Sequence, residues 1–255
     1  MIRKYVFLFA IFPIVVSSQT SSNSIDVTLE KGISLLADKK KEEACICFYK
    51  SKELGSKKAQ SYYDDNFCAD LALEKYKDGR TKLNLKQYEE AMPFFNDAIA
   101  LAGDSAAYNK RGLCNFMLSN YDSALADFSN AIKVAATNAS YYHHRAQVWL
   151  AKNEYQQAFD DCSESIKLNP KGESAYFTRA AAEEAMTQQN AALFDYSEIL
   201  RINPANAIAY YKRAVLKESF LNDRKASCED YNKAFELGYE DAQENVNLCK
   251  KIKKK

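Results

Sequence analysis

The sequence contains little glycine and little proline, 7 and 4 residues respectively among 255. Both residue types interrupt helices, glycine through its backbone freedom and proline through its missing N–H group. A chain this poor in both does not have the composition of a loop-rich or β-rich protein, so we expect helix throughout. Hydrophobic residues make up 47% of the sequence, which is enough for one extended array or two domains.

An excess of charge of either sign is also missing. Lysine and arginine number 35 against 34 aspartates and glutamates, which gives a formal net charge of +1. Nucleic-acid-binding domains concentrate positive charge, so the composition offers no case for a nucleic-acid partner. We interpret the one basic run, residues 250–255 interrupted by Ile252, as the solvated end of a helix, with a membrane or nucleic-acid contact as the alternative.

Motifs that carry chemistry are absent as well. The chain has no glycine-rich phosphate loop, no nucleophile elbow and no histidine pair at metal-ligand spacing. Its two histidines, His143 and His144, are adjacent, and neighbouring helix residues point about 100° apart. Cys45 and Cys47 lie too close together in the sequence for a typical zinc site. We therefore expect no enzyme, no cofactor and no bound metal.

The first eighteen residues differ in kind from the rest. Arg3 and Lys4 precede an apolar run, residues 5–16, and small or modest residues follow it. The run is too short to cross a bilayer core, so residues 1–18 are predicted to be a secretory signal peptide, with the mature chain starting near Gln19. An uncleaved anchor is the alternative. We expect an exported protein, periplasmic or secreted, and leave peripheral membrane association open.

Export changes the interpretation of the seven cysteines, since disulfides persist in oxidising compartments. Cys228 and Cys249 lie 21 residues apart near one end of the chain, as do Cys47 and Cys68 near the other. We expect Cys228 to pair with Cys249, and Cys68 to pair with Cys45 or Cys47. The alternative is that these residues are small buried hydrophobes, which is the interpretation we favour for the two cysteines in the middle of the chain.

What the sequence does contain is a 34-residue period, visible in register over residues 105–240. Self-similarity at a fixed period predicts a solenoid, in which each unit packs on its neighbours. A tyrosine recurs in one column, an arginine three residues later, and a small residue after each arginine. The three columns are Tyr108, Tyr142, Tyr176 and Tyr210; Arg111, Arg145, Arg179 and Arg213; and Gly112, Ala146, Ala180 and Ala214.

Each unit is predicted to contain two helices. The stretches Tyr142–Ala151 and Tyr155–Leu168 lack glycine and proline, and their apolar and small residues recur at helical spacing. A short polar break separates the two stretches. Pro170 ends the second helix, because its ring cannot continue the hydrogen-bond ladder. The repeat is therefore expected to be an antiparallel helix pair.

These columns resemble the tetratricopeptide repeat (TPR). The segment 139–172 carries residues of the family pattern at Tyr142, Ala146, Tyr155, Ala158 and Pro170. The resemblance implies an all-α, right-handed superhelical solenoid of antiparallel helix pairs, with about six repeats plus a C-terminal capping helix. In the last repeat the columns after Ala226 fall one residue late.

The expected division of the chain follows from the same repeats. We predict the signal peptide over residues 1–18, a divergent repeat with an added helix over 19–71, and the TPR array over 72–240. Residues 241–255 are predicted to form a basic capping helix or tail, since a solenoid needs a cover for its last apolar face.

The arginine column allows two interpretations. Four stacked arginines could form a basic ladder for an acidic partner. Alternatively, each arginine pairs with an aspartate of the facing helix, because an aspartate follows sixteen residues later in three units, at Asp127, Asp161 and Asp195. The matched aspartate column favours the structural interpretation.

In the family that the chain resembles, the concave face comes mainly from the first helix of each repeat. Here the corresponding positions hold an aromatic, mostly neutral set that suits an extended peptide or a partner helix. The alternative is that some of these side chains complete the core between repeats. The candidate partner-binding residues are Tyr76, Asn109, Phe116, His143, Phe177 and Tyr211.

The function expected from the sequence is therefore that of an exported TPR scaffold, which binds a protein or peptide partner through an aromatic concave groove. The alternative is an accessory subunit of an envelope or secretory assembly complex. One family subtype grips the C-terminal carboxylate of chaperones with lysine, asparagine and arginine at set positions. Those residues are missing from the matching positions here, so we do not expect that activity.

Overall fold

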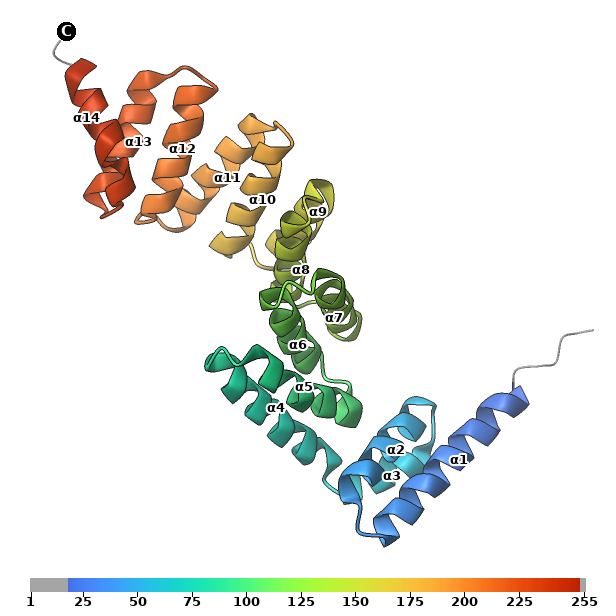
Figure 1. Ribbon diagram of the computed structural model, residues 1–255. Helices are drawn as coiled ribbons and strands as arrows, with labels where there is room; N and C mark the ends of the chain where they lie inside the picture. Colours follow the sequence, from blue (N-terminus) through green and yellow to red (C-terminus); the bar gives the residue numbers. More distant parts are fainter. Residues whose placement is uncertain (1–17, 253–255) are drawn as a thin grey trace, which may run out of the picture. The chain divides into compact units, whose positions relative to one another are not determined.

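The computed structural model describes residues 18–252, and every regular element in that range is a helix (Figure 1). The predicted all-α class is therefore confirmed for the described residues. The segment interpreted as a signal peptide lies outside them except for its last residue. The helices are α1 (Ser18–Ala37), α2 (Lys41–Glu53), α3 (Lys57–Asp65), α4 (Cys68–Asn84), α5 (Tyr88–Ala102), α6 (Ser105–Met117), α7 (Tyr121–Val134), α8 (Ala139–Ala151), α9 (Tyr155–Leu168), α10 (Glu173–Ala185), α11 (Gln189–Ile202), α12 (Ala207–Ser219), α13 (Arg224–Glu236), the 3-10 helix η1 (Glu240–Ala242) and α14 (Gln243–Ile252).

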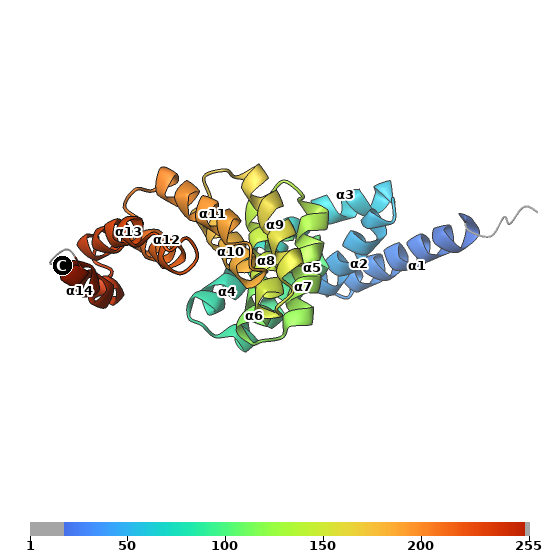
Figure 2. The same cartoon turned by 90° about the horizontal axis from the view of Figure 1, so that it is seen from above.

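Consecutive helices pack in antiparallel pairs. The pairs α6–α7, α8–α9, α10–α11 and α12–α13 each form one repeat, and successive pairs also contact each other (Figures 1 and 2). The two stretches predicted as helices within residues 139–172 correspond to α8 and α9. As predicted, α9 ends two residues before Pro170. The turn inside each repeat places one residue in the left-handed backbone region; in three successive repeats these are Ser119, Asn153 and Thr187, with φ of 62°, 62° and 60°.

The chain divides into two compact units. The N-terminal unit runs to Lys77 and includes residues 97–103, and the second unit comprises residues 78–96 and those from Asp104 onward. The core of the N-terminal unit contains Phe48, Cys68 and Leu101, all fully buried. Between its first two helices and α4 lies α3, in the region where the sequence predicts an added helix.

The core of the second unit follows the repeat columns. Fully buried residues of the second helices, such as Phe128 and Ala192, pack against side chains of the first helices. After α13 the chain continues into η1 and α14, and α14 packs on α13. Val246 of α14 is 2% exposed and joins the cluster formed by Ala214 and Tyr231 of the last repeat. Among the described residues, no helix is long and apolar enough to cross a membrane.

The small-residue column is shaped by the aromatic column that faces it. A methyl group added at Gly112 would lie 2.8 Å from a ring carbon of Phe128, so the ring occupies the space of the missing side chain. Glycine occurs in this column where the facing residue, sixteen positions later, is phenylalanine. In the same column, Ala146 and Ala180 are followed sixteen positions later by Cys162 and Tyr196. The glycine pairs are Gly32–Phe48, Gly79–Phe95 and Gly112–Phe128.

Candidate partner-binding trough

Four of the six candidate binding residues are half-buried side chains on successive first helices of the second unit. Phe116 lies on α6, His143 on α8, Phe177 on α10 and Tyr211 on α12. We call these four side chains the trough. Tyr76 is also half-buried, but it lies on α4 within the N-terminal unit and is not part of this set.

Three of the trough side chains are held by aromatic residues of other helices or turns. The ring of Phe116 lies 6.0 Å from that of Tyr121, and Phe177 meets Tyr196 edge-on, also at 6.0 Å between ring centroids. The ring of Tyr211 contacts two others, Tyr231 at 5.7 Å and Tyr239 at 4.9 Å. Each ring is therefore fixed by packing on one side while part of it stays accessible to solvent.

The histidines connect neighbouring repeats. His143 Nε2 lies 3.1 Å from Thr178 Oγ1, and His144 Nδ1 lies 2.8 Å from Asn109 Oδ1. Burial lowers the pKa of both rings, and that of His144 falls to about 4. Both histidines are therefore neutral at pH 7, and His144 donates its Nδ1–H to the amide oxygen. Asn109 is only 5% exposed, so it positions the neighbouring repeat and offers a partner little surface.

Two carboxylates on the trough side of the first helices were not among the predicted site residues. The hydroxyl of Tyr196 donates to Glu184, and that of Tyr231 donates to Glu218 at 3.2 Å. Both tyrosines are nearly fully buried, at 2% and 3% exposed, and burial raises the pKa of each, so both hydroxyls remain donors. The sequence contains a sign of this pairing, because glutamate and tyrosine occur together at these two repeat positions. The two preceding repeats hold apolar pairs at the same positions, Phe116 with Phe128 and Leu150 with Cys162.

The arginine column forms ion pairs inside the repeats, so the structural interpretation is confirmed. Each arginine makes two parallel hydrogen bonds to an aspartate of the facing helix, and these aspartate side chains are at most 9% exposed. The nearest oxygen lies 2.6–2.8 Å from the guanidinium. The pairs are Arg111–Asp127, Arg145–Asp161, Arg179–Asp195 and Arg213–Asp230. The sequence did not predict the pairing of Asp230, because this residue lies one position late, in the shifted part of the last repeat.

The same arginines also join each repeat to the one before it. The second guanidinium nitrogen of Arg179 donates to Ser163 at 3.2 Å, and Arg145 donates in the same way to Ser129 at 3.0 Å. A guanidinium has five donors in one plane, which allows it to bond an aspartate of its own repeat and a serine of the preceding one. The column is therefore part of the scaffold that holds the trough helices in register.

In two repeats, a second side chain of the first helix also donates a hydrogen bond to the buried aspartate, but in a third repeat the equivalent residue is acidic. Asn115 and Lys217 donate to the aspartates of their own repeats, at 3.0 and 2.7 Å. The equivalent residue next to Asp195 is Glu183, which is 3% exposed and whose Oε2 has no hydrogen-bond partner among the residues that the structure describes. Burial and the neighbouring Asp195 raise the pKa of Glu183 to about 7. A protonated Glu183 can donate to Asp195, as the other two residues do.

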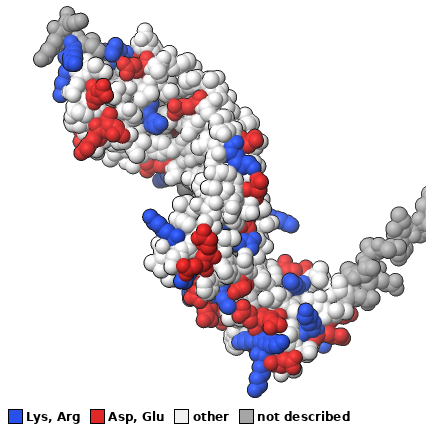
Figure 3. All heavy atoms as spheres, in the orientation of Figure 1, with Lys and Arg blue, Asp and Glu red and all other residues white. Residues whose placement is uncertain are grey.

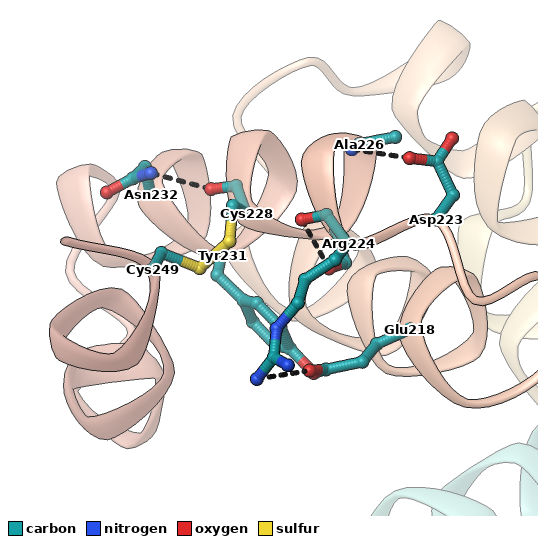
Figure 4. Close-up of a disulfide and its surroundings, with 9 residues drawn as sticks. Glu218, Asp223, Arg224, Ala226, Cys228, Tyr231, Asn232 and Cys249 are labelled. Carbon is teal, nitrogen blue, oxygen red and sulfur yellow. Dashed lines mark hydrogen bonds and ion pairs between the residues drawn. A yellow bond between two sulfur atoms is a disulfide. The ribbon is translucent and has the colours of Figure 1, made fainter. Parts of the chain in front are cut away.

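Disulfides lie near both ends of the described chain. Cys228 of α13 is joined to Cys249 of α14, with 5.7 Å between their Cα atoms (Figure 4). Cys45 is joined to Cys68 at 5.5 Å, and Cys47 is a buried free thiol. The structure thus brings together the pair expected at the C-terminal end, and of the two alternatives at the N-terminal end it joins Cys45.

Charge is mixed on the face that Figure 3 shows, as it is in the composition. On the face seen in Figure 3, acidic and basic side chains are interspersed, and neither sign forms a continuous field. This distribution gives no basic footprint of the kind that nucleic-acid-binding surfaces show.

The sequence model of the family described as "Tetratricopeptide repeat" matches residues 76–105. The chain therefore contains a segment that is similar to the tetratricopeptide repeat. The match covers the C-terminal part of α4 and all of α5, and the later helix pairs repeat the same architecture. Among curated proteins, none matches the chain by sequence.

Solved TPR-like structures share the fold. The crystal structure of MamA is similar with a TM-score of 0.59 and 19% identity, over 65% of this chain and 96% of MamA. MamA from Desulfovibrio magneticus RS-1 gives 0.60 and 17%, over 65% and 94%. YrrB, described as a TPR protein with an unusual peptide-binding site, gives 0.56 and 19%, over 72% and 92%. At these identities the likeness shows the fold alone.

Proposed function

We propose that this protein is a TPR scaffold that binds a protein or peptide partner through the trough of its second unit. The observation that carries the proposal is the repetition of half-buried side chains, mostly aromatic, on successive first helices, at Phe116, His143, Phe177 and Tyr211. Three of these rings are already fixed by their neighbours, so a partner orders few side chains on binding. Preorganised aromatic groups of this kind dominate the energy of many interfaces.

Two further observations support a binding role without catalysis. The polar groups near the trough are engaged in bonds between or within repeats, such as His144 with Asn109. YrrB, whose fold is similar, is described as having a peptide-binding site. An extended segment or a helix of a partner suits a row of side chains with a regular spacing.

We also propose that the protein works in an oxidising compartment. The pattern of residues 1–18 predicts export, and the two disulfides near the ends of the described chain are of the kind that persists outside reducing cytoplasm. Mass spectrometry of the protein from its own cells tests this directly. A mature N-terminus near Gln19 is expected, and a full-length, cytoplasmic protein with reduced cysteines would contradict the proposal.

The binding role is tested by selecting peptides from a displayed random library on the full chain, then measuring one selected peptide against variants. Truncating one central aromatic typically costs about 1–4 kcal/mol of binding, so Phe177→Ala with Tyr211→Ala should weaken the peptide at least about tenfold. Lys167→Ala is the matched control, since its side chain is 73% exposed on the second helix α9. Full binding by the double variant, with loss in the control, would place the partner on the outer face.

A further inference from the structure

Two successive repeats build the same arrangement between their first and second helices. A buried tyrosine hydroxyl holds a carboxylate, and an aromatic ring of the trough packs against that tyrosine. In one repeat the three residues are Glu184, Tyr196 and Phe177; in the next they are Glu218, Tyr231 and Tyr211. We call these two sets the acidic cradles.

We propose that each acidic cradle binds a lysine or arginine side chain, so that the partner is a peptide segment with two cationic residues. The inference rests on the proposed function, because it describes what the trough recognises. A carboxylate attracts a cation through its charge, and the face of a neighbouring aromatic ring adds attraction through the ring quadrupole. An acidic segment would meet two like charges, so the cradles select against it.

A cation already lies at one cradle. Nη2 of Arg224 lies 3.4 Å from Glu218, and 55% of the Arg224 side chain is exposed (Figure 4). The contact is long and open to solvent, so it is weak and displaceable. It shows that a guanidinium can reach this carboxylate while Tyr231 holds the carboxylate's other side. Arg224 thus stands in for a side chain of the partner.

The other cradle is open. Within the described residues, no ion pair joins Glu184 to a lysine or an arginine, although a carboxylate has about four acceptor sites and the bond from Tyr196 uses one. Satisfying the tyrosine hydroxyl requires only a neutral acceptor. The negative charge is therefore an additional property of the site, present in the two repeats that have tyrosine in the facing column and missing from the two before them.

The repeat spacing limits the distance between the two cations. Glu184 lies on α10 and Glu218 on α12, and both helices pack on α11. Each helix–helix contact spans roughly 10 Å, so two contacts give an upper limit of about 20 Å, which an extended chain covers in about six residues. We therefore expect peptides with separated lysines to bind better than those with adjacent lysines.

The experiment uses blocked peptides of alanine, serine and leucine that carry two lysines at spacings from one to five residues. Their affinity for the full chain is measured by fluorescence anisotropy, with norleucine and glutamate in place of lysine as comparison probes. Glu184→Gln with Glu218→Gln should weaken the lysine probe at least about tenfold and remove its salt dependence. The melting temperature should not change, because glutamine still accepts the tyrosine hydroxyls. Arg224→Ala should tighten binding several-fold by uncovering Glu218.

The outcomes separate this inference from the proposed function. If the Gln variant binds the lysine probe as the wild type does, while Phe177→Ala with Tyr211→Ala loses it, the trough binds peptides without reading charge and the inference is wrong. If the lysine and norleucine probes bind the wild type equally, the inference is also wrong. If no trough variant affects any bound peptide, the proposed function fails as well.

Discussion

At the scale of single residues, Glu183 is a buried carboxyl group whose protonation is coupled to folding. Its pKa is raised to about 7 by burial and by Asp195, whereas glutamates of an unfolded chain titrate near about 4.3. The folded state therefore holds the proton more tightly than the unfolded state does. The contribution of this group to stability is greatest below about pH 4.5 and is lost as the pH rises toward and through 7.

Glu183→Gln should therefore raise the free energy of unfolding at pH 8 by about 1–3 kcal/mol and change it little at pH 5. A glutamine at this place can donate to Asp195 at every pH, as Asn115 donates to Asp127. Urea unfolding at the two pH values measures the difference. Glu164→Gln, at an exposed position, is the control. If Glu183→Gln keeps the pH dependence of the wild type, Glu183 is not the group whose proton is coupled to folding.

The contact between Gly112 and Phe128 leads to a second prediction. A methyl group at Gly112 would lie 2.8 Å from the ring, so Gly112→Ala should destabilise the protein by about 1–3 kcal/mol through overpacking, less a few tenths gained from helix propensity. In the double variant Gly112→Ala with Phe128→Leu, a smaller side chain replaces the ring. This variant should lose less free energy of unfolding than the sum of the losses in the two single variants. Chemical denaturation of the four proteins of this cycle gives the coupling energy, and simple additivity would show that the ring does not fill the glycine's space.

At the scale of elements, the arginine column and the terminal disulfide stabilise different contacts between helices. The arginines connect each helix pair to the one before it, so they act at every junction between repeats of the second unit. The disulfide between Cys228 and Cys249 acts only at the end, where α14 covers the last apolar cluster, including Val246. Because α14 has only ten residues, it depends on this anchoring and on packing to remain helical.

Cys228→Ala with Cys249→Ala should lower the free energy of unfolding by about 2–4 kcal/mol and release α14 first. Hydrogen exchange measures both effects, and the amides of residues 243–252 should exchange much faster than those of α12. Cys162→Ala removes a buried free thiol elsewhere and is the control for simple loss of packing. Unchanged protection of α14 would mean that the disulfide is not what holds the cap.

Much of the fold could be predicted from the sequence because the repeat places equivalent residues in equivalent surroundings. The limits of α9 followed from Tyr155 and Pro170, and the pairing of Arg145 with Asp161 followed from two columns sixteen residues apart. Asp230 was missed because one extra residue shifts the last repeat. Cys45 and Cys47 could not be separated by spacing, since both lie on α2 and are close to Cys68 in the sequence.

Less of the candidate site could be predicted, because exposure depends on contacts between repeats that no single column shows. Asn109 has the right position in its helix, yet the following repeat covers it and His144 binds its amide oxygen. The role of Glu184 depends on a tyrosine of another helix. Such pairs become visible only when two columns are compared across all repeats.

At the scale of the whole molecule, the central expectation is that partners bind the first-helix side of the second unit. Its most direct test places a photoreactive phenylalanine analogue at position 177 of the full chain, or at position 167 as the outer-face control, in the protein's own cells. Irradiation should produce a covalent adduct with the same partner from position 177 and not from position 167. An adduct formed from position 167 alone would contradict this expectation.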